Sequence, residues 1–537
     1  GVLCPFGPLG ADYRESESRK GSGKAAFAYR FVNCNEISVI NQRFLRKMEE
    51  YSAGVLTFSQ TQYILFVNEK DTAMYTLLAD EERLNREMAD SRKRTTGGAS
   101  LYRSNALHFS ELREFLEHIP VIESHEHFAA FHAADDPLDF ILDTFYLGDF
   151  YSAGGEQVTG RGDYSFFTPI PHQLPERERY TLFQQIYRRS DKTAYARAMQ
   201  EGLRLCWGVE DIGEWEEYQK FSEKFRSRDA SIYDKVVEMC RIKAQIVDRG
   251  DLDSYMDGTL PYSPFCHFTF HMSGWRNIHT KEQLVGMQKY LGRTITCLDD
   301  YTEAFDRYLQ KCVNFGVVCL KDLNAYRRTL AISNPTKAEA EKAFNAVISH
   351  QRVIFGDEQI QPLEDWLFHY ALRRAAAFDL PVQLHTGHMA GIRNDVRKAN
   401  AANLLPTLEL HTDVRFDLFH ANWPYMDEFL FMGKNYPNVY LDLCWAHSID
   451  PLYCIELMKR AVMTVPHSKI MAFGGDTSAP EWLAGYLMLA KDNVASALAE
   501  LVDSTWLTEK EARQIALDWF FNNPNELFKL GFGKQLI

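Results

Sequence analysis

The 537-residue chain has little of what marks secreted or membrane proteins. Its ten cysteines include no CxxC pair, and several, such as Cys319, lie within apolar runs. That pattern is typical of reduced, buried thiols rather than of a disulfide framework. No apolar run reaches the roughly 18 residues that a membrane span needs, and the start of the chain lacks the apolar core of a signal peptide. We therefore expect a cytoplasmic protein with no membrane partner.

An excess of basic residues is also absent. The chain has 59 Lys and Arg against 73 Asp and Glu, which gives a formal net charge of -14. Phosphate backbones and anionic membrane surfaces attract basic proteins, so this balance argues against nucleic acid as a partner. We expect a small molecule as the partner. The oligomeric state stays open, with a homo-oligomer among the alternatives.

Residues 1–105 differ from the rest of the chain. They combine a charged, glycine-containing start, an apolar run at 63–67 and a charged, helix-like stretch that ends in two glycines at 97–98. A glycine pair after a basic run is typical of a helix end or a linker. We expect an N-terminal accessory segment over 1–105 and the main domain over 106–537.

From about residue 119 onward, short apolar strands alternate with amphipathic helices. Helical spacing is found at 301–314, 357–378 and 426–435, between several of the strands. This alternation predicts an α/β fold, a TIM-like (β/α)8 barrel. The eight expected strands are residues 120–122, 243–247, 265–270, 316–320, 380–384, 414–419, 439–443 and 470–473.

A long segment, residues 128–242, separates the first two expected strands. It is rich in aromatic and charged residues and has helical patterns at 191–205 and 229–241. Loops of this length are uncommon in compact domains, so we expect a large helical insertion after the first strand. TIM barrels hold their active sites at the carboxyl ends of the strands, where this insertion would cover the site.

The first expected strand ends in two histidines separated by one residue, His125 and His127. Side chains i and i+2 of a strand point to the same face, so the two imidazoles can converge on one metal ion. The pair alone is weak evidence, because histidine has many ordinary roles. Its meaning depends on the ends of the other strands.

Three further strands also end in titratable residues. The fifth strand ends in His385, the sixth in His420 and the eighth, after two glycines, in Asp476. The carboxyl ends of barrel strands meet at one face, so these side chains should lie near the histidine pair. As alternatives, the two histidines could be hydrogen-bonded core residues, and the aspartate could cap the helix expected at 481–491.

Taken in order, these strand ends resemble the amidohydrolase superfamily, over roughly residues 119–526. The resemblance implies one divalent metal ion, with His420 polarising the substrate and Asp476 moving a proton from metal-bound water to the leaving group. Histidine and carboxylate ligands suit Zn first, with Mn, Fe, Co or Ni tolerated. The implied metal ligands are His125, His127, His385 and Asp476.

Lys321 ends the fourth expected strand and precedes Asp322. In binuclear members of the superfamily, a lysine at about this point is carbamylated and bridges two metal ions. Residues 322–327 are more typical of a substrate-binding or structural segment, so we favour an unmodified catalytic Lys321 that contacts an anion or a carboxylate. A structural ion pair with Asp322 or another acid is the alternative.

The loops after the fourth, fifth and sixth strands carry candidate substrate-binding residues. Arginine suits an anionic substrate, since a guanidinium binds a carboxylate through two hydrogen bonds, although a solvated loop arginine is an equal alternative for Arg393. Aromatic residues such as Trp445 could wall a pocket, but they more often serve packing. The candidates are Arg327, His388, Arg393 and Trp423.

The chain is also similar to uronate isomerases, in the large insertion, the fifth strand and the pair Arg393 and Asn394. Its eighth strand is followed by DTSAP, which lacks the arginine common in the isomerase motif. Our first hypothesis is a metal-dependent hydrolase that attacks a C–N or C–O bond of a small polar substrate, carboxylated substrates included. The alternatives are a uronate isomerase-like aldose-ketose isomerase, a metal-dependent decarboxylase, and a binding protein on a degenerate barrel.

Overall fold

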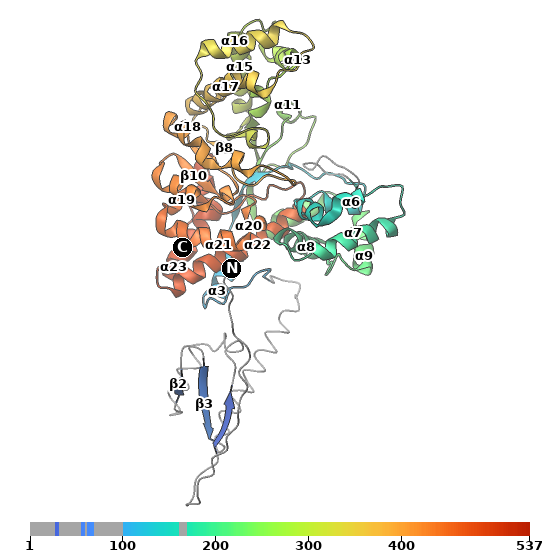
Figure 1. The fold of residues 1–537 in the computed structure, drawn as a ribbon, viewed down its shortest axis with the longest axis vertical. Coiled ribbons are helices and arrows are strands. Elements are labelled where there is room, and N and C mark those ends of the chain that lie inside the picture. Colours follow the sequence, from blue (N-terminus) through green and yellow to red (C-terminus); the bar gives the residue numbers. More distant parts are fainter. Residues whose placement is uncertain (1–26, 32–54, 59–61, 69–99, 160–168) are drawn as a thin grey trace, which may run out of the picture. The chain divides into compact units, whose positions relative to one another are not determined.

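The computed structural model describes residues 27–31, 55–58, 62–68, 100–159 and 169–537, and the chain divides into two compact units, Gly1–Ala99 and Ser100–Ile537 (Figure 1). In the first unit, three strands form an antiparallel sheet with β3 in the middle. The apolar run at 63–67 lies within β3, and the helix end expected at 97–98 lies outside the described residues. The three strands are β1 (Phe27–Phe31), β2 (Val55–Phe58) and β3 (Gln62–Asn68).

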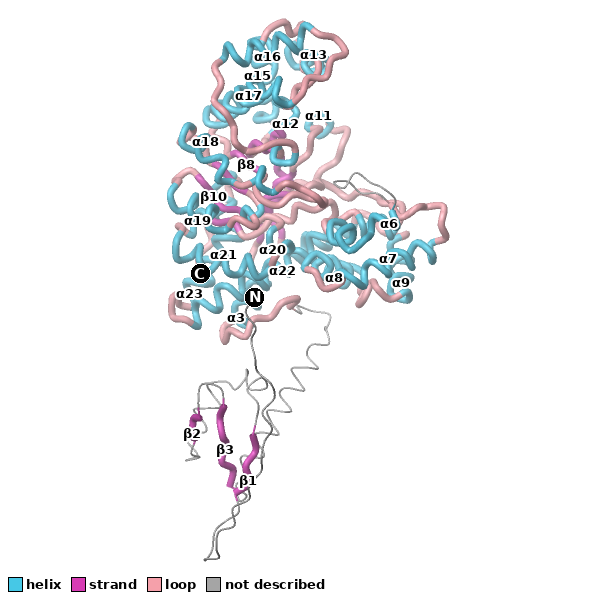
Figure 2. Tube along the Cα trace, in the orientation of Figure 1, coloured by secondary structure: helices cyan, strands magenta, loops and turns pink. Residues whose placement is uncertain are grey.

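Eight parallel strands form the core of the second unit and pair in chain order (Figure 2). The first and last strands also meet, because the Ser124 N–H donates to the Phe473 carbonyl at 3.0 Å and the Asp476 N–H to the His125 carbonyl at 3.0 Å. The predicted TIM-type barrel is confirmed, and each expected strand corresponds to an observed one. These strands are β4 (Val121–Glu126), β5 (Ile242–Val247), β6 (Cys266–His271), β7 (Cys319–Asp322), β8 (Val382–Leu384), β9 (Phe416–Leu418), β10 (Val439–Asp442) and β11 (Ile470–Met471).

Two glycines permit the close approach of chain segments where the barrel closes. A Cβ on Gly474 would lie 2.6 Å from Ser124 Oγ, and a Cβ on Gly475 would lie 2.6 Å from Glu126 Oε2. Both neighbouring side chains are fully buried, so they have little room to move. The closure therefore depends on the absence of side chains at these two positions.

We expect Gly475→Ala to destabilise the barrel by about 1–3 kcal/mol, because an added methyl group overpacks a filled core. Urea denaturation followed by circular dichroism measures the change. Gly274→Ala is the matched control, since a Cβ at Gly274 meets nothing within 4 Å. Equal unfolding midpoints for the two variants would contradict this account of the closure.

Long helices pack around the barrel. The three expected helices correspond to α15 (Leu298–Phe315), α17 (Asp357–Ala377) and α19 (Met426–Asn435). The most buried of the long helices is α22 (Pro480–Asp503), which begins with a proline at a position where no backbone N–H is needed. It packs against α8 (Ala194–Trp207), α3 (Phe109–His118), α10 (Ser231–Cys240) and α21 (Pro451–Thr464). Among the described residues, no helix is both long and apolar enough to cross a membrane.

The described part of the segment between β4 and β5 is mostly helical, as expected, and forms a lobe beside the barrel (Figure 1, cyan to green). Aromatic side chains build its core. The rings of Tyr180 and Tyr218 lie 4.7 Å apart, and Trp215 lies 5.1 Å from Tyr180. Besides α8 and α10, its helices include α4 (Pro137–Leu142), α5 (Tyr146–Phe150), α7 (Glu176–Ser190) and α9 (Trp215–Phe225).

Candidate metal centre and adjoining pocket

Four histidines and one aspartate from four strand ends lie together at the carboxyl end of the barrel. His127 Nε2 is 2.8 Å from Asp476 Oδ1, and His125 Nε2 is 3.6 Å from the same oxygen. His420 Nε2 is 3.8 Å from Asp476 Oδ2 and 3.0 Å from His385 Nδ1. The structure thus brings all the expected metal ligands together, with His420 beside them.

In each of the four histidines, the other ring nitrogen lies against an oxygen that only accepts hydrogen bonds. That nitrogen must therefore carry a proton. In the neutral ring the nitrogen that faces the cluster keeps a lone pair, whereas His127 Nε2 lies 2.8 Å from Asp476 Oδ1 and donates a hydrogen bond to it when protonated. The four pairs are His125 Nδ1 with Gln383 Oε1 (3.2 Å), His127 Nδ1 with the Asp248 carbonyl (3.2 Å), His385 Nε2 with the His388 carbonyl (2.7 Å) and His420 Nδ1 with the Cys444 carbonyl (3.0 Å).

The donor set fits a divalent metal ion. His125 Nε2 is buried and has no hydrogen-bond partner among the described residues. His385 Nδ1 and His420 Nε2 face each other at 3.0 Å, although neither carries the proton in this tautomer. Buried lone pairs need a donor or a cation, and imidazole nitrogens with a carboxylate are common ligands of Zn²⁺ and related ions.

Electrostatics favour the neutral, metal-binding form of three of the histidines. Burial holds the pKa values of His125, His385 and His420 well below the ordinary range of histidine. At His127, burial acts in the same direction, but the hydrogen bond and the charge of Asp476 outweigh it and raise the pKa. Among these histidines, the Asp476 carboxylate therefore interacts most strongly with His127.

The backbone is strained at two of these strand ends. His420 has a φ of 60° and Asp476 a φ of 56°, both in the left-handed region that residues other than glycine seldom adopt. Such conformations cost free energy and persist where the surroundings enforce them, commonly at functional sites. Here the two strained residues lie in turns, and the side chains of both lie in the cluster.

Two side chains that the sequence analysis did not single out also offer ligand atoms. Asp248 follows β5 directly and lies within 4.8 Å of the nitrogens of His125 and His127, and Cys444 has the same relation to His420 and Asp476. The signal for Asp248 was present in the sequence, since it is a carboxylate directly after an expected strand.

Lys321 is buried, with Nζ 3.5 Å from the centroid of the Phe419 ring. Asp322 pairs with Arg276 at 3.0 Å, so the alternative of a Lys321–Asp322 ion pair is wrong. Adjacent residues of a strand point to opposite faces, which explains why the two side chains separate. Burial lowers the pKa of Lys321, although Asp476 and Asp248 oppose this effect. The catalytic role of Lys321 stays a prediction.

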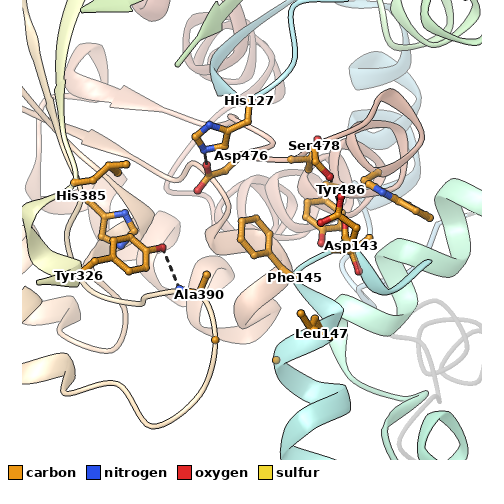
Figure 3. A pocket seen from close by; sticks show the side chains of 16 residues that line it. His127, Asp143, Phe145, Leu147, Tyr326, His385, Ala390, Asp476, Ser478 and Tyr486 are labelled. Carbon is orange, nitrogen blue, oxygen red and sulfur yellow. Dashed lines mark hydrogen bonds and ion pairs between the residues drawn. The ribbon is translucent and has the colours of Figure 1, made fainter. Parts of the chain in front are cut away.

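A pocket of about 410 Å³ opens beside the cluster (Figure 3). His127, His385 and Asp476 form part of its lining, together with Asp143 and Phe145 from the insertion. Tyr326, Trp482 and Tyr486 complete the aromatic part of the wall. The aromatic wall residues did not stand out in the sequence, because isolated aromatics carry no local signal of a pocket.

The two arginines expected to bind substrate do not line this pocket. Arg327 pairs with Asp357 and with the buried Glu364. Arg393 is exposed and lies 3.4 Å from Glu156 of the insertion. Their binding roles stay predictions that this geometry does not support.

His388 and Trp423 also lie outside the pocket lining. The half-buried ring of His388 contacts Trp423 and Trp445, with ring centroids 5.4 and 4.9 Å apart. Trp423 donates its indole N–H to Asp450 at 3.4 Å. Trp445 in turn stacks on Phe145 at 3.9 Å, so these aromatics support the pocket wall from behind.

The barrel and the histidine–carboxylate cluster are typical of metal-dependent TIM-barrel enzymes. Residues 323–518 match a protein family described as Amidohydrolase. The chain is 28% identical over 229 residues to Protein fluG of Emericella nidulans, a match that covers 40% of this chain and 26% of that protein. The chain thus spans about a quarter of the length of this curated relative.

Solved structures with the same fold include uronate isomerases. The uronate isomerase of Thermotoga maritima has a TM-score of 0.63 and 13% identity, covering 79% of this chain and 98% of that one. The glucuronate isomerase of Caulobacter crescentus has a TM-score of 0.61 and 15% identity, covering 81% of this chain and 99% of that one. A Lactobacillus casei protein provisionally named a metal-dependent hydrolase has a TM-score of 0.55 and 16% identity, covering 78% of this chain and 97% of that one. The family match, together with the fold, confirms the resemblance to the amidohydrolase superfamily, and the uronate isomerases share this fold.

Proposed function

We propose that this protein is a metal-dependent hydrolase of the amidohydrolase type, which cleaves a C–N or C–O bond of a small substrate. The observation that carries the proposal is a cluster at the edge of a pocket, in which three imidazoles lie within 3.8 Å of Asp476 and His385 lies against His420. His125, His127, His385 and Asp476 would hold the ion, and we favour Zn.

When bound, such an ion lowers the pKa of water and polarises a carbonyl group. Asp476 lines the pocket, so its carboxylate is placed to take a proton from the attacking water and to return it to the leaving nitrogen or oxygen. His420 lies next to Asp476, but its proton is on Nδ1, so its Nε2 lone pair is placed to bind the ion or to accept a proton. The role of His420 in polarising the substrate stays a prediction, and it would require a proton on Nε2.

The pocket favours hydrolysis over the two alternative reactions. A uronate isomerase and a decarboxylase both act on carboxylates, and a carboxylate not held by the ion needs a cationic partner. Among the described residues that line the pocket, none is a lysine or an arginine. A neutral amide or ester has no such requirement.

Metal analysis tests the site. We expect the double variant His125→Ala/His127→Ala to lose at least about nine tenths of its bound metal, because two of the three proposed imidazole ligands are removed. Inductively coupled plasma mass spectrometry of the dialysed protein measures this content. The control is His350→Ala/His467→Ala, which removes two exposed histidines. Equal metal content in both variants would overturn the proposed site.

The reaction is tested with one metal-loaded sample. Release of amine or alcohol from amide and ester panels would support hydrolysis. Interconversion of aldose and ketose uronates, or release of CO2 from carboxylated substrates, without any hydrolysis would overturn the proposed reaction while leaving the metal site intact.

A further inference from the structure

We propose that the pocket binds a substrate with an aromatic or flat apolar ring beside the scissile bond and with no anionic group next to Asp143. This inference rests on the proposed hydrolase function and adds the class of substrate. It differs from the carboxylated substrate considered in the sequence analysis.

The first observation is the aromatic wall. Phe145, Tyr326, Trp482 and Tyr486 all line the pocket that contains His127 and Asp476. Figure 3 shows the Phe145 ring projecting into the pocket below Asp476, between Tyr326 and Tyr486 in this view. Aromatic side chains prefer to stack on, or meet edge to face with, another ring, and the volume of about 410 Å³ suits a single-ring compound.

The wall is also held in place by the surrounding structure. Phe145 stacks on Trp445 with ring centroids 3.9 Å apart and an interplanar angle of 27°. Tyr326 accepts a hydrogen bond from the Ala390 N–H at 3.1 Å, and its ring lies 4.6 Å from that of His385. Rings held by such contacts lose less conformational entropy when a ligand ring binds to them.

The second observation is the charge of the wall. The described lining residues contribute no lysine or arginine, whereas Asp143 contributes a carboxylate. The loop that carries Asp143 is tied to the barrel, since Ser478 Oγ donates to the Asp143 carbonyl at 3.1 Å. Arg327 is held by two carboxylates outside the pocket. An anionic group of a substrate that lies next to Asp143 would therefore meet a like charge.

Hydroxamates test the inference, because they bind metal ions through one constant head group while the attached group varies. Isothermal titration calorimetry on the zinc-loaded protein compares benzohydroxamate, acetohydroxamate and 4-carboxybenzohydroxamate. We expect benzohydroxamate to bind about 30-fold more tightly than acetohydroxamate, from burial of the phenyl ring. We expect the added carboxylate to weaken binding about tenfold, through repulsion by Asp143.

Phe145→Ala should reduce the preference for benzohydroxamate to about threefold or less, because the ring loses its stacking partner. Phe431→Ala, at an exposed position on α19, is the matched control and should keep the preference. Retained binding of acetohydroxamate would show that the Phe145→Ala variant is folded. The comparison of the three hydroxamates is made on the unaltered protein and does not depend on any variant.

The outcomes separate this inference from the function on which it rests. Equal affinity for benzohydroxamate and acetohydroxamate, or tighter binding of the carboxylated compound, would overturn the substrate class and leave the hydrolase proposal standing. Failure of all three hydroxamates to bind a protein with verified zinc content would overturn the proposed metal centre at this pocket, and the substrate class with it.

Discussion

Asp476→Asn is expected to lower the turnover number by about 1,000-fold, because an amide cannot accept the proton of the attacking water. The substitution keeps the size of the side chain. It also suits the backbone, since Asp476 has a φ of 56° and asparagine tolerates the left-handed region better than most residues. The loss should therefore reflect chemistry rather than folding.

The measurement is the turnover number at saturating substrate, with metal content determined for each sample, because Asp476 is also a candidate ligand. Asp413→Asn, on an exposed turn after α18 (Leu405–Leu410), is the matched control and should retain the activity of the unaltered protein. Activity within about tenfold of that protein at equal metal occupancy would refute the proton-transfer role of Asp476.

The barrel could be predicted from the sequence because its signals are local. Each strand is a short apolar run, and the side chain at its carboxyl end is displayed at one shared face. His125, His385, His420 and Asp476 lie far apart in the chain, yet each position follows from its own strand. The expected strand at 470–473 was too long, since pairing stops at Met471, ahead of the closure at Gly474.

The pocket could not be predicted because its contacts depend on the tertiary fold. Arg327 carries a charge suited to a substrate, but its partners Asp357 and Glu364 lie in α17, where no sequence spacing links them to it. Phe145 belongs to the insertion and Tyr486 to α22, and only packing brings both to the wall. The strained φ angles of His420 and Asp476 likewise arise from their surroundings.

One buried ion pair fastens the insertion to the helix that carries part of the pocket wall. Arg228 lies between α9 and α10, and its Nε and Nη2 donate to the two carboxylate oxygens of Glu481 at 2.6 and 2.9 Å. The side chains are 4% and 0% exposed, and the guanidinium also lies over the rings of Phe131 and Phe140. Glu481 directly precedes Trp482 of the pocket wall.

Arg228→Ala is expected to destabilise the protein by about 3–5 kcal/mol, because it leaves the Glu481 carboxylate buried without a counter-charge. Chemical denaturation measures the loss. Arg226→Ala is the matched control, since Arg226 pairs with Glu176 at an exposed position and should cost less than about 1 kcal/mol.

A double variant identifies the cause of that loss. Arg228→Met/Glu481→Gln removes both charges and keeps much of the volume, so it should be more stable than Arg228→Ala alone if the unpaired carboxylate is responsible. A double variant no more stable than the single one would assign the loss to packing against Phe131 and Phe140 instead of to charge.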